Sequence, residues 1–300
     1  MKKMYVLASA LAIAALALSA CGAATPAPAT NLLGDIKQRG YILVSTDPNY
    51  EPASFLNTEA TRPSDTKCPS DALTTAEMQG FDVDAARAIG DGLGVETCFA
   101  TPDWDLITAG SWVDKWDVSV GSMTILPERQ QVLDFSVPYY GTPAVIAVRA
   151  DADITSLADL EGQALCAGVA TTYETWLSGG DLGPGIKIYA KAPANITVVP
   201  LTTDQECAQA LAAGREDFVG YVTGSPVVNA NIAADLPVKQ LGDPVFNEIL
   251  AAAFDRSSSL DTTSLRAEVD KIFTAMLEDG RLAELSNKWF GEDLTQGLLN

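Results

Sequence analysis

Arg129, at the end of the stretch GSMTILPER (121–129), is a candidate anion-binding residue. Its planar guanidinium can donate two parallel, charge-assisted hydrogen bonds to a carboxylate, a geometry that lysine cannot match. The alternative is an ordinary surface arginine that pairs with Glu128 or Asp134. The motif follows an apolar strand-like run, DVSVG (117–121), so Arg129 would lie just beyond the end of a strand.

Three threonines could add hydrogen bonds to the same ligand. Thr124 offers a backbone N–H and a hydroxyl close to Arg129. Thr171 and Thr172 precede the helical segment YETWL (173–177), and N–H groups at a helix N-terminus favour an anion. Capping of the local helix is the simpler role for these two threonines, and it is compatible with binding.

The aromatic and acidic candidates lie in short loops. Tyr50 follows a strand in a segment rich in Pro and Asn, which favours exposure at the carboxyl end of that strand. Core packing is the usual fate of an aromatic side chain, and it is the alternative for both Tyr50 and Trp104. Asp47 could contact a polar group of a ligand, or it could cap the turn before Pro48.

The composition excludes several classes of function. The chain has no histidine, which rules out a Ser-His-Asp or Cys-His nucleophile and the usual zinc sites. The formal net charge is −20, which disfavours binding to nucleic acid and to anionic lipid surfaces. No stretch after the N-terminal segment is long and apolar enough to span a membrane. We also expect no metal, since histidine is absent, and no cofactor.

Residues 1–20 are typical of a secretory signal peptide, because two lysines precede a short apolar run that ends in small residues. The run is too short for a spanning helix. The segment LSAC (18–21) resembles the lipobox of bacterial lipoproteins, so we expect cleavage before Cys21 and lipidation of its thiol. A soluble exported protein is the alternative. Residues 21–32 would form a flexible tether, poor in large apolar groups.

Four cysteines follow Cys21, namely Cys68, Cys98, Cys166 and Cys207. An exported protein with an even number of cysteines favours disulfides over metal ligands, and no C-x-x-C spacing is present. The sequence alone leaves three connectivities open.

Strand and helix patterns alternate along the chain. Apolar, β-branched runs predict strands at 41–46, 144–150, 196–201 and 217–222. Helical spacing predicts helices at 82–93, 269–277 and 282–289, and the capping box Thr203-x-x-Glu206 begins another helix that Gly214 can end. This alternation predicts α/β layers around mostly parallel sheets.

Eight motifs in a fixed order resemble those of the bacterial solute-binding proteins of family 3, the polar amino-acid receptors of ABC importers. They are TDPNYEPASF (46–55), GFDVDAARAIG (80–90), DWDLI (103–107), WDVSVGSMTILPERQQVLDFSVPYY (116–140), ITSLADLEG (154–162), ATTYETWL (170–177), ECAQALAAGRED (206–217) and DGRLAELSNKWFGED (279–293). Each motif is weak by itself, but their order is highly specific.

The resemblance implies an α/β chain with a two-lobed periplasmic-binding-protein fold, in which two hinge strands join the lobes and the lobes close on a ligand. Lobe one would comprise residues 33–143 and 243–300, and lobe two would comprise residues 144–242. The hinge strands would lie near 141–147 and 242–251.

This division also selects a disulfide pairing. Cys68 would join Cys98 and Cys166 would join Cys207, because each pair then lies inside one lobe. The second pair also looks like one that occurs in family members.

The resemblance further implies roles for site residues. Arg129 matches the arginine that binds the ligand's carboxylate, and Ser122 would present its carbonyl to an ammonium group. Tyr50 and Trp104 match the aromatic pair that sandwiches the ligand's side chain, although DWDLI is one residue shorter than the usual form.

One departure concerns the ammonium of an amino acid. Family members usually carry an aspartate after the strand that corresponds to DFVGYV (217–222), and it pairs with the ligand's α-ammonium. Here Val222 is followed by Thr223, Gly224 and Ser225, with no acid. A buried ammonium without a carboxylate partner is costly. Either carbonyls and the general acidity replace the aspartate, or the ligand is not a standard α-amino acid.

We therefore predict a non-catalytic, lipid-anchored receptor that captures a small carboxylate, by preference a polar amino acid, and delivers it to an ABC permease. It would act as a monomer at the outer face of the cytoplasmic membrane or in the periplasm, without nucleic acid.

The alternative is a cyclohexadienyl (arogenate or prephenate) dehydratase, because the same fold hosts that enzyme. Asp47 and Glu51 lie near the proposed cleft, yet no second group pairs with them in sequence. A periplasmic sensor module is a third class, and it would need a fused signalling domain.

Overall fold

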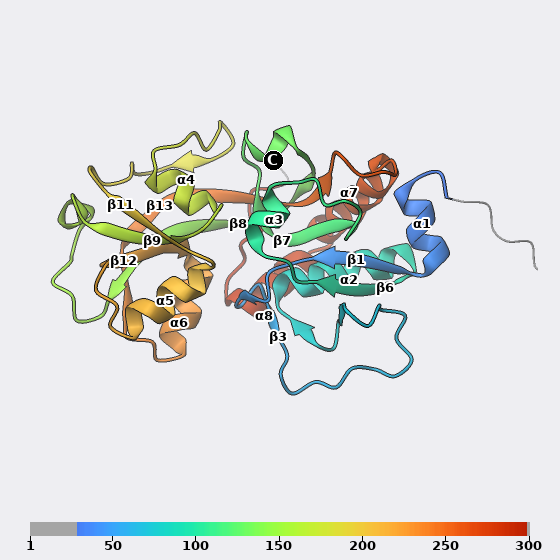
Figure 1. The fold of residues 1–300 in the computed structure, drawn as a ribbon, viewed down its shortest axis with the longest axis horizontal. Coiled ribbons are helices and arrows are strands. Elements are labelled where there is room, and N and C mark those ends of the chain that lie inside the picture. Colours follow the sequence, from blue (N-terminus) through green and yellow to red (C-terminus); the bar gives the residue numbers. More distant parts are fainter. Residues whose placement is uncertain (1–28, 299–300) are drawn as a thin grey trace, which may run out of the picture.

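The computed structural model describes residues 29–298, which form two α/β lobes side by side (Figure 1). Two long antiparallel strands, β8 (Leu133–Arg149) and β13 (Val238–Asp255), pass from one lobe into the other. The signal peptide, Cys21 and most of the tether lie outside the described residues. No helix within 29–298 has the length and apolar character needed to cross a bilayer.

Lobe one holds the N-terminal and C-terminal parts of the described chain. Its helices are α1 (Leu32–Arg39), α2 (Phe81–Leu93), α3 (Trp104–Thr108), α7 (Thr263–Glu278) and α8 (Arg281–Phe290), with the short 3₁₀ helix η1 (Arg129–Gln131). Its sheet contains β1 (Tyr41–Ser45), β4 (Leu73–Thr74), β6 (Glu96–Ala100) and β7 (Val118–Thr124). A separate three-stranded sheet contains β2 (Asn49–Tyr50), β3 (Ser54–Leu56) and β5 (Met78–Gln79).

Lobe two is formed by the middle of the chain. Its helices are α4 (Thr172–Leu177), α5 (Asp204–Ala212) and α6 (Ser225–Ala233), with the 3₁₀ helix η2 (Leu157–Leu160). Its strands are β9 (Ala164–Gly168), β10 (Lys187–Ile188), β11 (Thr197–Leu201) and β12 (Gly220–Gly224). The two-lobed α/β fold predicted from the sequence is therefore confirmed.

One sheet runs through both lobes, in the order β11-β9-β12-β8-β13-β7-β1-β6-β4. Strand β1 is parallel to β6 and β7, and β9 is parallel to β11 and β12. The loops after β1, β7 and β9 therefore leave the carboxyl ends of parallel strands, the edge where α/β folds place ligands.

The two cores show where the chain crosses between the lobes. Tyr140 packs in the core of lobe one and Ala144 in that of lobe two, on either side of residues 141–143. On β13, Phe246 packs in lobe two and Leu250 in lobe one. We therefore propose the second crossing at 247–249, a few residues beyond the expected boundary at 242. Leu126, numbered within lobe one, also packs in the core of lobe two.

The folded part begins slightly earlier than the expected boundary between tether and lobe. Asn31 caps α1 by accepting a hydrogen bond from the backbone N–H of Gly34 at 2.8 Å. Leu32, expected in the tether, is buried and begins the helix. An N-cap side chain satisfies one of the unpaired N–H groups of the first turn, so the polar residue belongs to the helix.

One strand is displaced from its predicted range. The segment 217–222 was predicted as a strand, but β12 begins at Gly220 and ends at Gly224. Arg215 and Asp217 form an exposed ion pair, while Phe218 between them and the strand is buried in the core. The chain therefore bends inward at 217–219 before it can pair as a strand.

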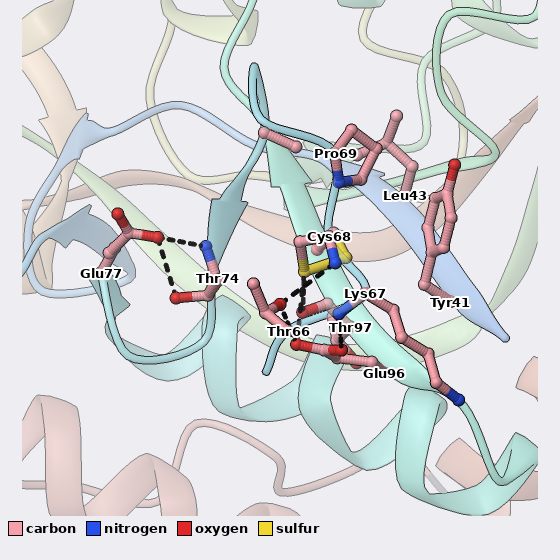
Figure 2. Close-up of a disulfide and its surroundings, with 12 residues drawn as sticks. Tyr41, Leu43, Thr66, Lys67, Cys68, Pro69, Thr74, Glu77, Glu96 and Thr97 are labelled. Atoms are coloured by element: carbon pink, nitrogen blue, oxygen red, sulfur yellow. Dashed lines mark hydrogen bonds between the residues drawn. A yellow bond between two sulfur atoms is a disulfide. The ribbon is translucent and has the colours of Figure 1, made fainter. Parts of the chain in front are cut away.

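Two disulfides join Cys68 to Cys98 and Cys166 to Cys207, with Cα–Cα distances of 5.4 and 5.7 Å. The first ties the long loop before β4 to strand β6 (Figure 2). Next to it, Glu96 accepts hydrogen bonds from the Thr66 hydroxyl and from the Lys67 backbone N–H. The second disulfide links β9 to α5 inside lobe two.

We expect all four cysteines to be oxidised in these two pairs. The double variant Cys166→Ala/Cys207→Ala should lower the free energy of unfolding by about 3–4 kcal/mol, because a disulfide that closes a loop of this size constrains the unfolded chain. Non-reducing peptide mapping checks the pairing, and denaturant unfolding of the oxidised proteins checks the stability. A Cys68–Cys166 link, or free thiols in the folded protein, would contradict the division into lobes.

Candidate functional site

All eight sequence-predicted site residues line one pocket between the lobes. They are Asp47, Tyr50, Trp104, Ser122, Thr124, Arg129, Thr171 and Thr172. The pocket encloses about 450 Å³ of space not filled by protein atoms, part of it open to solvent. Gly121, Tyr173, Thr202, Thr203, Asp204 and Glu248 complete its lining.

Arg129 is a buried cation, with 3% of its surface exposed. Its Nη1 donates to the carbonyl of Thr124 at 3.1 Å, and its Nη2 donates to the carbonyl of Ala170 in lobe two at 2.8 Å. No ion pair joins it to a carboxylate among residues 29–298. Burial lowers the pKa of Arg129 to about 10, so the guanidinium stays charged near neutral pH.

Trp104 covers the guanidinium and also reaches lobe two. The centre of its ring lies 5.6 Å from Cζ of Arg129, and its Nε1 donates to the Ala170 carbonyl at 3.3 Å. A cation over an indole face is stabilised by the ring's quadrupole. The shorter DWDLI motif therefore does not remove Trp104 from the pocket.

Two further hydrogen bonds join the lobes across the pocket. The hydroxyls of Tyr50 and Tyr173 lie 3.0 Å apart, and the Thr172 hydroxyl donates to that of Thr124 at 2.8 Å. Together with the bonds to Ala170, they hold the lobes in contact.

Ser122 adopts a left-handed backbone conformation, with φ of 56°. Its hydroxyl donates to Asp82 at 2.6 Å, and Asp82 also accepts from Tyr139 at 2.6 Å. This network engages the Ser122 hydroxyl, and the Ser122 N–H donates to the Tyr139 hydroxyl at 3.1 Å, so the carbonyl is the Ser122 group that the network leaves for a ligand. Asp82 was not identified from the sequence, because an acid in the first turn of α2 is an ordinary feature of a helix.

Thr171 and Asp47 both cap local backbone, which is the alternative to ligand binding that the sequence offered for each of them. The Thr171 hydroxyl caps α4 by accepting from the Glu174 backbone N–H at 3.2 Å. The Asp47 carboxylate accepts from the Asn49 backbone N–H at 2.8 Å, which fixes the turn around Pro48. Both residues nevertheless line the pocket.

Two buried acids in the pocket were missed by the sequence analysis. Asp204, the first residue of α5, accepts from the Gly168 N–H at 2.8 Å and from the Thr223 hydroxyl at 3.0 Å. Glu248, on the hinge strand β13, accepts from the Thr124 hydroxyl at 2.6 Å. The segment after β12 carries no acid, but Thr223 is fully buried against Asp204, so lobe two does place a carboxylate in the pocket.

Burial raises the pKa of both acids to about 7. Hydrogen bonds from Gly168 to Asp204 and from Thr124 to Glu248 oppose the rise, because they favour the charged form. Burial likewise raises the pKa of Asp82 to about 7 and that of Asp117 to about 6.

We expect the ligand-free protein to lose stability as the pH rises from about 5 to about 8. The folded state holds protons on these four acids at a pH where the unfolded chain has released them, so ionisation at higher pH favours unfolding by up to ~1.4 kcal/mol per acid and pH unit. The chain has no histidine, so few other side chains titrate in this interval. Thermal unfolding across the pH series checks this.

The double variant Asp204→Asn/Glu248→Gln should reduce the pH dependence and leave the part due to Asp82 and Asp117. Glu161→Gln, at an exposed position, is the control and should keep the full slope. A melting temperature that rises between pH 5 and pH 8 would contradict the burial of these acids in the uncharged form.

Comparisons with known proteins place this geometry in a family. The chain matches the family model of the bacterial extracellular solute-binding proteins, family 3, over residues 42–292. It is 29% identical over 272 residues to the L-cystine-binding protein TcyJ of Escherichia coli (strain K12), and the match covers 88% of each chain.

Two solved structures are similar in fold. A mutant of ArgBP from T. maritima superposes with a TM-score of 0.69 at 26% identity, covering 87% of this chain and 99% of that one. The ancestral amino acid-binding protein AncCDT-1, a precursor of cyclohexadienyl dehydratase, gives 0.67 at 27% identity, covering 86% and 99%. The family match spans most of the chain, and the chain therefore belongs to the bacterial extracellular solute-binding proteins of family 3 and is a binding protein rather than an enzyme.

Proposed function

We propose that this protein captures an amino acid between its lobes and delivers it to the permease of an ABC importer, while a lipid on Cys21 anchors it to the membrane. The observation that carries the proposal is the buried Arg129, which faces the pocket without a carboxylate partner in the described chain. The relatives support the class of ligand, since they are named for binding cystine and arginine.

The guanidinium retains donors for a ligand. Arginine has five N–H donors, and hydrogen bonds to Thr124 and Ala170 occupy two of them. A buried charge without a counter-ion is costly, and a carboxylate that enters the pocket would offset that cost with charge-assisted hydrogen bonds. The unused N–H donors of Arg129 therefore favour an anionic group on the ligand.

The remaining pocket walls suit a small polar molecule. Tyr50 and Trp104 present aromatic surface from lobe one, and Tyr173 presents it from lobe two. A ligand that contacts both walls binds the closed form better than the open form, and this difference in affinity is what drives closure. The relatives support delivery to a permease, since one of them is named as an ABC transporter arginine-binding protein.

The lipid anchor rests on the sequence LSAC (18–21) that ends the signal-like segment. It would keep the receptor close to its permease at the outer face of the cytoplasmic membrane.

We expect metabolic labelling with an alkyne-tagged fatty acid to mark the full-length protein in its bacterial host and to leave Cys21→Ser unlabelled. Cys21 is the first residue of the proposed mature chain and carries the thiol that would be modified. Gel fluorescence after tag ligation reads the outcome. A labelled Cys21→Ser variant, or an unlabelled wild type, would refute the anchor.

We expect wild-type protein to bind at least one of L-cystine, L-arginine and L-glutamine, and not to bind the decarboxylated analogues cystamine and agmatine. Arg129→Ala should weaken binding of the amino acid by about 2–5 kcal/mol, the range for truncating one partner of a buried charge pair. Isothermal titration at fixed ionic strength measures both effects.

Arg129→Lys tests the fork rather than the charge, and it should also lose affinity because lysine cannot pair with a carboxylate at two points. Arg215→Ala removes an exposed guanidinium and is the matched control that should bind as the wild type does. Equal affinity of wild type and Arg129→Ala for the amino acid would rule out Arg129 as the carboxylate site.

A further inference from the structure

We propose that Glu248, on the hinge strand β13, binds the α-ammonium of the ligand, with Asp204 as a second acid on the lobe-two side. This inference rests on the proposed function, because it names the half of the amino acid that Arg129 does not hold. The carboxylate partner of the ammonium would then lie on β13, where the chain crosses between the lobes, in place of an aspartate after β12.

Glu248 has one carboxylate oxygen in use and one left open. Its Oε2 accepts the Thr124 hydroxyl at 2.6 Å, while its Oε1 is buried with no partner at hydrogen-bond distance in the described structure. The Tyr173 hydroxyl is near enough to lower the pKa of Glu248, but its hydrogen bond is to the Tyr50 hydroxyl. The residue is 2% exposed and lines the pocket. A buried acceptor without a partner costs free energy unless a donor reaches it. A ligand in the pocket is the donor that can enter and leave.

An ammonium is the donor that fits this oxygen best. Glu248 forms no ion pair with Arg129 or with any other cation in the described chain, so Arg129 compensates its negative charge only in part and from longer range. A neutral hydroxyl or amide would satisfy Oε1 as a hydrogen-bond acceptor but would add nothing to that partial compensation. A cationic N–H donor satisfies both requirements at once.

Thr124 contacts both charged residues. Its carbonyl accepts from Arg129, and its hydroxyl donates to Glu248, so one residue contacts both the cation and the anion. The carboxylate and the ammonium of an α-amino acid are separated by a single carbon. Opposite charges that contact one threonine therefore suit a zwitterion, whose two charged groups also lie near each other.

Asp204 adds negative charge from the other lobe. Each of its oxygens already accepts one hydrogen bond, from Gly168 and from Thr223, and each retains a second lone pair. Because Asp204 belongs to lobe two and Glu248 to the crossing strand, an ammonium between them would attract both parts in the closed form.

The test compares amino acids with their α-deaminated analogues. The probes are L-cystine with 3,3′-dithiodipropionate, L-arginine with 5-guanidinopentanoate, and L-glutamine with 4-carbamoylbutanoate, titrated into wild type, Glu248→Gln and Asp204→Asn. Glu248→Gln keeps the shape and the Thr124 contact but removes the charge. Glu161→Gln, which removes an exposed charge in lobe two, is the control.

We expect Glu248→Gln to weaken binding of the amino acid by about a hundredfold, an effect within the range for truncating one partner of a buried charge pair. Asp204→Asn should weaken binding less, by about tenfold, because both oxygens of Asp204 already accept hydrogen bonds from the protein. The deaminated analogue should bind wild type weakly and bind Glu248→Gln as well or better, because a variant without the charge no longer buries an unpaired anion. The preference for an ammonium should therefore collapse in Glu248→Gln.

Two kinds of failure are distinguishable. If wild type binds an amino acid and Glu248→Gln keeps the same preference over the deaminated analogue, the inference is wrong and the proposed function stands. If Glu248→Gln weakens both ligands equally, the residue supports lobe closure only, and the inference is again wrong. If wild type prefers the deaminated acids or binds none of the six probes, the amino-acid function is overturned, and the assignment of Glu248 is overturned with it.

Discussion

The arrangement of the pocket depends on one buried cation. Arg129 has almost no solvent contact and no carboxylate within ion-pair distance in the part of the chain that the structure describes, so its direct contacts are backbone carbonyls and the face of Trp104, and Glu248 acts on it only from longer range. Carbonyl dipoles and an aromatic face stabilise a guanidinium only partly compared with a carboxylate. The site is therefore electrostatically incomplete on its own, and this incompleteness gives an anionic ligand its affinity. The same residue also reaches across to Ala170, so ligand recognition and contact between the lobes share one side chain.

The acids of the pocket follow a different rule from the cation. Asp204 and Glu248 are buried, and burial raises the pKa of each to about 7, so protonation can relieve part of their cost when no ligand is present. Arg129 has no such escape near neutral pH, because burial lowers its pKa only to about 10. The cation is thus a permanent charge and the acids are adjustable charges. A cationic group on the ligand would favour their ionised forms and so strengthen its own binding.

Sequence reasoning found the residues that stand in ordered motifs and missed those that stand in ordinary secondary structure. Arg129, Thr124 and Ser122 lie in one contiguous stretch at the end of β7 and just beyond it, and the structure brings them to the same pocket. Glu248 was missed because a single acid in the strand FNEIL is expected to face solvent. Its burial depends on the antiparallel pairing with β8. Asp204 was missed because acids are common in the first turn of a helix, where they favour the helix dipole. The elements themselves were largely predictable, since their periodicity is local, whereas the bend at 217–219 depends on the core that receives Phe218.

The net negative charge of the whole chain affects how a carboxylate can reach Arg129. A net charge of −20 repels small anions at long range, although salt screens that repulsion beyond about 8–10 Å. A free carboxylate would therefore meet an unfavourable field before it reaches Arg129, while a zwitterion, with no net charge, meets almost none. Once the ligand is inside, water is displaced and the nearby charges act with less screening. Discrimination is then made by contact with Arg129 on one side and the acids on the other. A protein this acidic can hold a carboxylate only where it has excluded solvent and aimed a cation, and it is the burial of Arg129 beneath Trp104 that meets both conditions.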